Sequence, residues 1–507
     1  MKSLSLLITL CLQIVFLRPI FTESSLAQHA VDNYNSALVL FNSHENNQQS
    51  GEYLVHHLSI PASSFTPMRG FYNYENHGRY LKYYDNPSDS DPGVFLAPVQ
   101  LPQGAVITKM TFYFKDPGAG TAFARLNRAT HYQLGSIILG GLSSTDLFPP
   151  SLGDTSTSSF SPVPVFDNSQ YFYFISLELP MGGQVWGHGV ALEYTLPEQA
   201  VSPGKINIPP AAFSPFEDGY EFFIGDRMWH NWGPGSSQTN GWYLAPVYFP
   251  DGAVVKKMTF YWRRIDATVE AAVHLQRTRL GYDTYQDMAV ATSLAGVGDF
   301  SSSTIDTTIN SPLIDNSQYA YWVVLDIPAA TNPFNGVVEL QDVEIEYEVP
   351  PTSGHLNSVP AAGFRSFEDG YDFQNHGRHL FHSQGPGGGT ANGWYLTPLN
   401  LPDGNSISSL SFFAYVNSTQ AGTVRLQRTE WGTGNYQDLA VIVTGTGDLG
   451  NSKFSSNTII GGPIDNSRYA YWLIWDLPAN AIPSVDIQGQ AVQISLGYRL
   501  NLPLVIH

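Results

Sequence analysis

The chain of 507 residues contains a single cysteine, Cys11, and few charged residues. Cys11 lies in an apolar run at the N-terminus, so the rest of the chain can form no disulfide and no thiolate site. Charged residues make up 13%, whereas about a quarter is usual in globular domains. Acidic residues outnumber basic ones by 43 to 24, which disfavours nucleic acid and anionic lipid as partners.

Familiar catalytic motifs are missing from the sequence as well. It has no G-x-S-x-G elbow, phosphate-binding loop, H-E-x-x-H pair or dinucleotide fingerprint. We therefore predict no catalytic residues, no cofactor and no metal site, and a protein that is not an enzyme.

The first 27 residues have the features of a secretory signal peptide. Lys2 precedes an apolar run from Leu4 to Leu17, and Ser25-Leu26-Ala27 offers small residues for cleavage. The alternative, a membrane anchor, needs roughly 20 apolar residues, and Arg18-Pro19 ends the run too early. No later segment is apolar enough to span a bilayer. We expect a secreted protein, either extracellular or at the cell surface.

One phrase, Asp-Asn-Ser-x-Tyr, occurs three times at nearly equal spacing. Its aspartates, Asp167, Asp315 and Asp465, are 148 and then 150 residues apart. A period of this length corresponds to a whole domain. The predicted organisation is a signal peptide (1–27), an N-terminal extension (28–58), repeat 1 (59–198), repeat 2 (207–350), repeat 3 (358–500) and a C-terminal tail (501–507).

Each repeat has the composition and patterning of strands and turns. Aromatic residues reach 13%, and 46 glycines and 34 prolines supply turns. Val424–Arg428 alternates apolar and polar residues, and Pro402-Asp403-Gly404 is a typical turn. Seven or eight short strands per repeat indicate an all-β protein of three tandem jelly-roll-like sandwiches.

The N-terminal extension contains a compact apolar run, Ala37–Phe41. This run could add a strand to repeat 1. It could instead pair with the sheet edge of another subunit and so build a homo-oligomer or filament.

The repeated phrase offers oxygen ligands that could hold calcium, but one Asp and one Asn do not complete its coordination shell. We interpret it as an Asx turn, in which the carboxylate caps backbone N–H groups. The residues concerned define the repeats structurally: Asp167, Asn168, Asp315, Asn316, Asp465 and Asn466.

Two further clusters are interpreted as structural. His376, His379 and His382 are spaced by three, which puts neighbours on opposite faces of a strand and disfavours zinc. The adjacent pairs Glu217-Asp218 and Glu368-Asp369 point apart, unlike the carboxylates that flank a glycosidic bond.

The candidate ligand-binding residues are aromatic and differ between repeats. Trp229, His230 and Trp232 are predicted to lie in a loop, where a tryptophan can stack on a sugar, and Trp431 is a further candidate. The alternative is tryptophan folded over the end of the sandwich. A repeated arginine (Arg128, Arg277, Arg428) is predicted to pair with the acidic residue at the end of the next long strand (Glu178, Asp326, Asp476).

The segments Ile-Pro-Ala-Ala-x-Phe, Leu-Pro-Asp-Gly, Lys-Met-Thr-Phe-Tyr-Trp and Ile-Asp-Asn-Ser-x-Tyr-Ala-Tyr resemble a tandem β-rich module of uncharacterised secreted proteins from environmental bacteria. A jelly-roll unit of this length also loosely resembles the trimer-forming C1q/tumour-necrosis-factor-like class. That resemblance implies an intramolecular pseudo-trimer of the three repeats.

These observations favour a non-enzymatic extracellular structural or interaction protein of a surface, filament or matrix, possessing the capacity to self-assemble. Two alternatives remain open. One is a carbohydrate-binding, lectin-like protein with a glycan partner, and the other is a secreted polysaccharide-degrading enzyme.

Overall fold

A computed structural model describes most of the chain after residue 54. The described residues are 55–70, 72–85, 91–116, 120–131, 135–144, 152–196, 204–217, 219–225, 227–232, 239–264, 269–282, 284–294, 300–329, 338–348, 356–368, 371–384, 391–431, 435–479 and 487–497. Contacts divide the chain into two units, Met1–Leu54 and Val55–His507. Only the second unit contains described residues, and it holds all three repeats.

Repeat 1 consists of β1 (Val55–Pro61), η1 (Ala62–Ser64), β2 (Thr66–Pro67), β3 (Asn73–Asn76), β4 (Leu81–Asp85), β5 (Gly93–Val99), β6 (Val106–Lys115), β7 (Phe123–Thr130), β8 (Ser136–Ser143), β9 (Leu152–Thr157), β10 (Tyr171–Leu179) and β11 (Trp186–Thr195).

Repeat 2 follows the same order, with β12 (Gly204–Ile208), η2 (Pro210–Ala212), β13 (Ser214–Pro215), β14 (Glu221–Ile224), β15 (Met228–Trp232), β16 (Gly241–Pro246), β17 (Val254–Arg264), β18 (Ala272–Arg279), β19 (Tyr285–Thr292), β20 (Phe300–Asp306), β21 (Tyr319–Ile327) and β22 (Val338–Glu348).

Repeat 3 consists of β23 (Leu356–Pro360), η4 (Ala361–Gly363), β24 (Arg365–Ser366), β25 (Asp372–Asn375), β26 (Leu380–Gln384), β27 (Gly393–Leu399), β28 (Ser406–Ser418), β29 (Thr423–Glu430), β30 (Tyr436–Val443), β31 (Gly447–Ser456), β32 (Tyr469–Leu477) and β33 (Ile487–Gly497). The predicted all-β class is therefore confirmed. The expected seven or eight strands per repeat were too few, because each opening segment adds short strands such as β2, β3 and β4.

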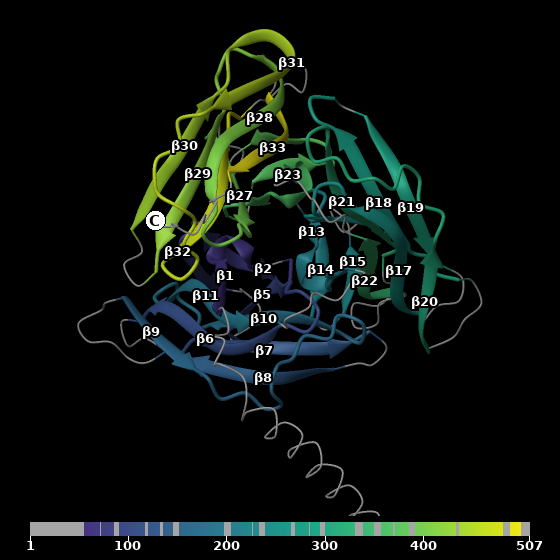
Figure 1. Ribbon diagram of the computed structural model, residues 1–507, viewed down its shortest axis with the longest axis vertical. Coiled ribbons are helices and arrows are strands. Elements are labelled where there is room, and N and C mark those ends of the chain that lie inside the picture. The colour runs from purple at the N-terminus through teal and green to yellow at the C-terminus, as the bar shows by residue number, and fades with distance from the viewer. Residues whose placement is uncertain are drawn as a thin grey trace, which may run out of the picture. The chain divides into compact units, whose positions relative to one another are not determined.

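Every repeat forms one six-stranded and one five-stranded sheet. In repeat 1 the order is β3-β4-β11-β6-β9, with β1 also paired to β11, and β2-β5-β10-β7-β8. Repeats 2 and 3 have the same order with their own strands. Figure 1 shows the two sheets of repeat 1 as neighbouring layers, with β9, β6 and β11 in one and β10, β7 and β8 in the other.

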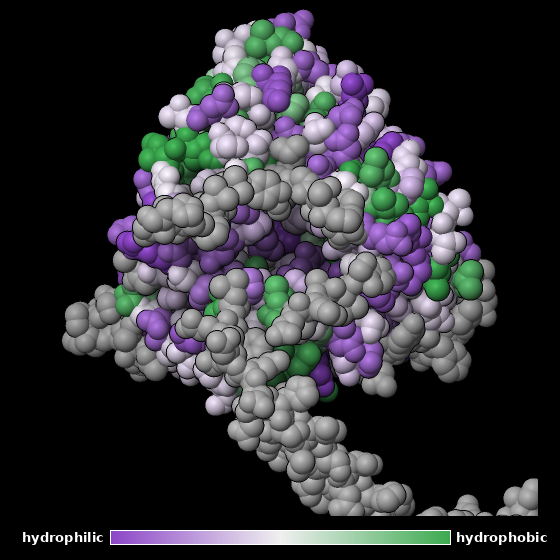
Figure 2. Space-filling model, in the orientation of Figure 1, coloured by the Kyte–Doolittle hydropathy of each residue, from purple (hydrophilic) through white to green (hydrophobic). Residues whose placement is uncertain are grey.

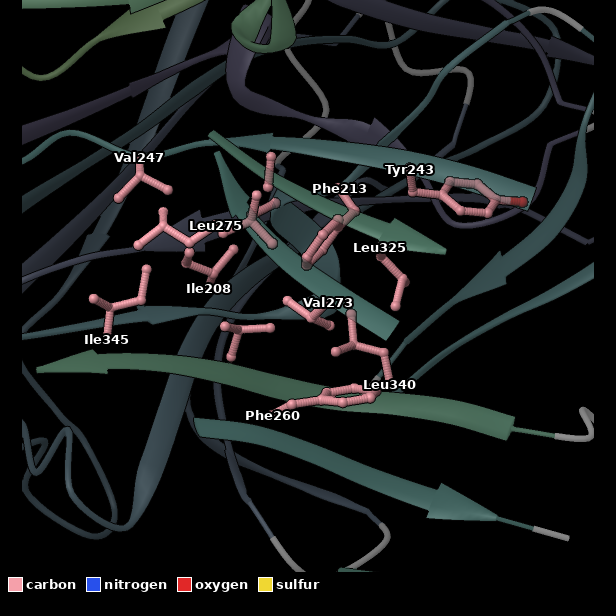
Figure 3. Close-up of a cluster of buried hydrophobic side chains, with 14 of the residues drawn as sticks. Ile208, Phe213, Tyr243, Val247, Phe260, Val273, Leu275, Leu325, Leu340 and Ile345 are labelled. Carbon is pink, nitrogen blue, oxygen red and sulfur yellow. The ribbon is translucent and has the colours of Figure 1, made fainter. Parts of the chain in front are cut away.

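The two sheets of a repeat share one apolar core. In repeat 2 the cluster includes Phe260 and Leu340 from the six-stranded sheet and Val273, Tyr243 and Leu325 from the five-stranded sheet. Figure 3 shows Val273, Leu325, Leu340 and Phe260 between the facing strands, with the Tyr243 ring at one side of the cluster. Six sheets within one unit could also be described as six blades of a β-propeller instead of three separate domains.

The turns have the geometry that their sequences predict. Gly104, Gly252 and Gly404 follow Pro-Gln or Pro-Asp and have φ values of 81°, 77° and 78°. Only glycine adopts this left-handed conformation without steric cost, which explains why each repeat has glycine there.

The first strand of each repeat docks on the previous repeat, just after its Asp-Asn-Ser turn. Asn207 Nδ2 donates to the carbonyl oxygens of Asn168 and Tyr171 of repeat 1, both at 2.8 Å. Ser358 Oγ donates to the Tyr319 oxygen of repeat 2 at 2.7 Å.

The third of these contacts joins repeat 1 to repeat 3. Ser59 Oγ lies 3.0 Å from the Asn466 oxygen and 2.8 Å from the Tyr469 oxygen. Each repeat therefore contacts the other two.

Backbone bridges repeat the same pattern. The amide of Asn76 donates to Phe367 oxygen at 2.7 Å, that of Asn375 donates to Phe216 oxygen at 2.7 Å, and that of Ile224 donates to Met68 oxygen at 2.8 Å.

The packing at the three contacts differs in chemistry. Between repeats 3 and 1, Trp431 stacks on Tyr113 with ring centroids 4.6 Å apart. Between repeats 2 and 3, Leu280 packs on Phe413. Between repeats 1 and 2, His131 Nδ1 lies 2.9 Å from Asp342 Oδ2, and both side chains are fully buried.

Several predictions for the ends of the chain lie outside the described residues. These are the signal peptide, Ala37–Phe41 and the tail 501–507. The predicted N-terminal extension overlaps repeat 1, because β1 already begins at Val55. Among the helices of the described part, none has the length and apolar character needed to cross a bilayer.

We predict that Trp431→Ala will lower the free energy of unfolding by about 3–5 kcal/mol, because it leaves a cavity at the contact with Tyr113. Equilibrium denaturation in urea measures this change. Val443→Ala in the same repeat is the control, because Val443 is 58% exposed and its truncation should cost less than about 0.5 kcal/mol. Equal losses for the two variants would contradict the assigned packing.

Candidate functional site

A groove of about 380 Å³ lies between repeats 3 and 1, within the size range of small-ligand sites. We call it the 3–1 groove. Its lining includes His77 and Arg79 of repeat 1 and the following residues of repeat 3: Trp394, Arg425, Gln427, Tyr436, Asp438, Trp472 and Asp476. Figure 2 shows one face of the unit, with polar and apolar residues interspersed and a hydrophilic hollow near its centre.

Two aromatic rings of the 3–1 groove are open to solvent. Trp394 is 43% exposed and Tyr436 is 53% exposed. Trp394 is held by an edge contact with Phe367, at 5.2 Å between centroids, and the Arg79 guanidinium lies 5.1 Å from the Tyr436 ring. Exposed and positioned rings of this kind are typical of ligand-binding surfaces.

The carboxylates of the groove are held in place by hydrogen bonds. Asp438 Oδ2 accepts from Arg425 at 3.0 Å, and its Oδ1 accepts from Gln427 at 2.5 Å. Asp476 Oδ1 accepts from Asn392 Nδ2 at 2.7 Å. The remaining lone pairs of these oxygens can accept hydroxyl groups of a ligand.

Repeat 1 contributes to the groove through a tight turn. Asn76 Oδ1 accepts from the Gly78 amide at 3.0 Å, and Gly78 has a φ of 73°. A Cβ atom at Gly78 would lie 2.2 Å from the Trp472 ring, so only glycine fits. This turn brings His77 to 4.3 Å from Phe367. Burial lowers the pKa of His77, although Glu75 opposes the shift.

The same residue types recur between repeats 2 and 3, at what we call the 2–3 site. Trp242 is 45% exposed and Tyr285 is 52% exposed. Asp287 accepts from Gln276 at 2.8 Å, and Asp326 accepts from Asn240 at 2.9 Å.

Repeat 3 completes the 2–3 site with the equivalent turn. His376 lies 4.5 Å from Phe216, and the Arg378 guanidinium lies 5.3 Å from the Tyr285 ring. The 3–1 groove and the 2–3 site are therefore built to one plan.

The corresponding positions between repeats 1 and 2 lack these groups. Val94 replaces the tryptophan, Ser136 replaces the tyrosine and Ile138 replaces the aspartate, by the register of the strands. Arg125 is paired with Glu178 at 2.5 Å. Thus two of the three contacts between repeats carry the candidate site.

The four residues predicted to bind a ligand do not come together. The loop prediction for Trp229 and Trp232 was wrong, because Met228–Trp232 pairs with β14 as strand β15. Trp229 stacks on Phe223 at 4.3 Å, and the side chain of Trp232 lies outside the described part. Trp431 is only 8% exposed, and its ring is covered by Tyr113.

His230 is fully buried in the core of repeat 2. Its Nδ1 lies 2.7 Å from the Tyr243 hydroxyl and its Nε2 lies 3.0 Å from the Thr239 oxygen. Burial lowers its pKa to about 4. His382 has the equivalent place in repeat 3, with Tyr395 at 2.8 Å. No cluster of metal-ligating side chains occurs among the described residues.

The aspartates of the repeated phrase accept hydrogen bonds from nearby groups. Asp167 Oδ1 accepts from the Ser169 amide at 3.0 Å, and Asp315 and Asp465 make the same contact at 3.0 and 3.1 Å. This is the geometry of an Asx turn.

The asparagines of the phrase point inward. Asn168, Asn316 and Asn466 donate to the oxygens of Leu101, Phe249 and Leu401 at 2.8–2.9 Å.

The predicted ion pairs of the repeated arginine were wrong. Arg128, Arg277 and Arg428 lie over the rings of Tyr171, Tyr319 and Tyr469 at 4.1–4.4 Å. In repeat 1 the acidic residue, Glu178, instead pairs with Arg125, three residues before Arg128 in the same strand.

A signal for the site was present in the sequence. The phrases Asn-Gly-Trp-Tyr-Leu and Tyr-Gln-Asp occur in repeats 2 and 3, at Asn240 and Asn392 and at Tyr285 and Tyr436. Repeat 1 has neither phrase. Polar and aromatic residues shared by two repeats could have indicated the two related sites.

No protein-family model matches the chain, and no curated protein matches it significantly. Among solved structures, the chain is similar to the N-terminal CBM22-1–CBM22-2 tandem domain of Paenibacillus barcinonensis Xyn10C. The TM-score is 0.22 and the sequence identity is 10%, and the match covers 60% of this chain and 100% of the other.

It is also similar to a triple jelly-roll protein of an archaeal virus, with a TM-score of 0.17 and 11% identity over 87% and 89% of the two chains. A structure of Sulfolobus Turreted Icosahedral Virus gives a TM-score of 0.17 and 12% identity over 86% and 91%. These scores are too low to establish a common fold or function. They also leave the C1q/tumour-necrosis-factor-like resemblance without support.

We predict that the stability of the protein falls as the pH drops from 6.5 toward 4, in part because of His230. Its pKa is lowered in the folded state, so unfolding takes up a proton in this range and is favoured by acid. His230→Gln should reduce the loss of melting temperature between pH 7 and pH 4. His382→Gln should act in the same direction. If the melting temperature of the variant and of the wild type fell equally with pH, the result would contradict a buried neutral imidazole at His230.

Proposed function

We propose that the protein binds carbohydrate in the 3–1 groove and at the 2–3 site. The observation that carries this proposal is the pairing of an exposed tryptophan with a hydrogen-bonded aspartate, built twice from equivalent positions. The first pair is Trp394 with Asp438, and the second is Trp242 with Asp287.

The chemistry of these groups suits a sugar. The apolar C–H face of a pyranose packs on an aromatic ring, while its hydroxyl groups need acceptors and donors arranged around the edge. Trp394 and Tyr436 offer rings, Asp438 and Asp476 offer acceptors, and Arg425 offers donors. Because Gln427 and Asn392 already hold the two carboxylates, little ordering is needed when a ligand binds.

We further propose that each repeat is a jelly-roll sandwich and not a pair of propeller blades. A propeller blade is built from strands of a single four-stranded sheet, whereas here the chain crosses between two sheets, as from β5 to β6 and from β6 to β7. The shared core of each sheet pair supports the same interpretation.

The proposed context is extracellular. The N-terminal sequence supports secretion, and the low charge and the lack of catalytic motifs support an interaction or structural role at a surface or in a matrix. Two equivalent sites on one chain would allow the protein to bridge two glycan segments. Self-assembly through Ala37–Phe41 remains a proposal based on sequence.

Glycoside hydrolysis is a second candidate function. Asp438 and Asp476 line the same groove, and two carboxylates facing one bond are what hydrolysis requires. We favour binding, because both carboxylates are engaged by neighbouring side chains: Asp438 by Arg425 and Gln427, and Asp476 by Asn392.

We predict that Trp394→Ala and Trp242→Ala each remove one of two binding sites. A glycan array would identify the ligand, and titration calorimetry would then count the sites. Each single variant should lower the stoichiometry from two to one. The double variant should bind at least tenfold more weakly, which corresponds to about 1.4 kcal/mol.

Tyr282→Ala is the matched control, because Tyr282 is 47% exposed and is not among the residues that line the 3–1 groove or that we assign to the 2–3 site. It should bind as the wild type does. A double tryptophan variant with unchanged affinity would remove the basis of the proposal.

We predict that the wild-type protein releases no reducing sugar from a polysaccharide that it binds. Asp438→Asn and Asp476→Asn should weaken binding through loss of charged acceptors. A reducing-end assay over several days checks this. Sugar release by the wild type that either variant abolishes would identify the protein as a hydrolase instead.

A further inference from the structure

The opening segments of the three repeats line one cavity, and its lining residues differ from those of the 3–1 groove. Thr66, Ser214 and Arg365 occupy equivalent positions in their repeats, one residue after Phe65, Phe213 and Phe364. Two repeats therefore place a small hydroxyl side chain where the third places a guanidinium.

Arg365 connects all three repeats. Its Nε donates to Ser214 Oγ at 2.7 Å, one terminal nitrogen donates to Ser64 oxygen at 2.8 Å, and the other donates to Ala212 oxygen at 3.1 Å. All three acceptors are uncharged. Burial lowers the pKa of Arg365 to about 10, and within the described part of the chain no carboxylate forms an ion pair with it.

A guanidinium has five N–H groups, and these three contacts use three of them. Arg365 borders two cavities, of about 60 and 50 Å³. Since one water needs about 10–15 Å³, the larger cavity has room for a small ion together with water.

The larger cavity is lined by hydroxyl groups. Ser63, Thr66, Ser214 and Ser366 all border it. Ser63 and Thr66 are 1% and 2% exposed, and within the described residues Ser63 Oγ and Thr66 Oγ1 have no hydrogen-bond partner. Buried hydroxyl groups without partners are unusual and indicate a missing ligand or water.

We infer that the cavity beside Arg365 binds a small monovalent inorganic anion of the size of chloride. The anion would accept hydrogen bonds from the guanidinium and from the hydroxyl groups of Ser63 and Thr66, and it would neutralise the buried charge. A buried cation is costly unless it is paired, and an anion at this junction would stabilise all three repeats together.

Glu217 borders the same cavity and is the competing source of negative charge. The Tyr220 side chain forms a hydrogen bond with its carboxylate.

The direct test is a crystal of the full-length protein grown in sodium bromide. The expected result is an anomalous peak in the cavity, within hydrogen-bonding distance of Arg365. A cavity without bromide would overturn the inference, and this experiment needs no variant.

The second test compares melting temperatures in sodium chloride and sodium gluconate at equal ionic strength. The wild type should melt at higher temperature in chloride, increasingly so with concentration. Arg365→Ser, which installs the residue found at position 214, should lose this response, and Thr66→Val should weaken it. Arg365→Lys keeps the charge and should retain the response. Equal chloride responses in wild type and Arg365→Ser would overturn the inference.

Glu217→Gln separates the two sources of negative charge. It should leave the chloride response intact. A chloride response that appears only in this variant would mean that Glu217 neutralises Arg365 in the wild type, and the inference would fail.

Discussion

The docking of each repeat's first strand on the preceding repeat is the interaction on which the rest of the structure depends. Asn207, Ser358 and Ser59 donate to backbone oxygens beside the Asp-Asn-Ser turn of the neighbour. Each bond contributes only about 0.5–1.5 kcal/mol, but together the bonds set the register between repeats. The turns around Gly78 and Gly377 contact Trp472 and Trp322 of the preceding repeat, and the proposed binding sites form at these contacts. The phrase that marks the repeats is thus also their docking point.

Each proposed sugar site is formed by two repeats, so neither site belongs to a single repeat. Repeat 3 supplies Trp394 and Asp438 to one site and, through its turn, His376 to the other. Repeat 1 has Val94 and Ser136 at the corresponding aromatic positions, while its turn contributes His77 and Arg79 to the 3–1 groove. Three repeats in one chain can differ in this way, whereas three identical subunits cannot. Arg365 is another such difference between the repeats, because the equivalent positions hold Thr66 and Ser214.

The sequence alone predicted the all-β class and the positions of the glycine turns, because each depends on residues close together in the chain. It could not predict the sheet order or the partner of Arg428, which depend on strands brought together by folding. The residues of the proposed binding site were missed for the same reason: Arg79 and Asp438 lie far apart in sequence and converge only when repeat 3 meets repeat 1. Trp431 was misjudged because an aromatic side chain in a turn gives no sign of whether a neighbouring domain covers it.

The contacts between consecutive repeats join residues that are 39 positions apart in the chain, Asn168 with Asn207 and Tyr319 with Ser358. The contact between the first and last repeats joins Ser59 to Asn466, which are 407 positions apart. Two of the three junctions can therefore form while the chain is being made, and the third must wait for its end. Until repeat 3 is complete, the docking edge of β1 and the ring of Tyr113 stay uncovered. During synthesis from the N-terminus, the contact between the first and last repeats is therefore the last of the three for which both partners are present.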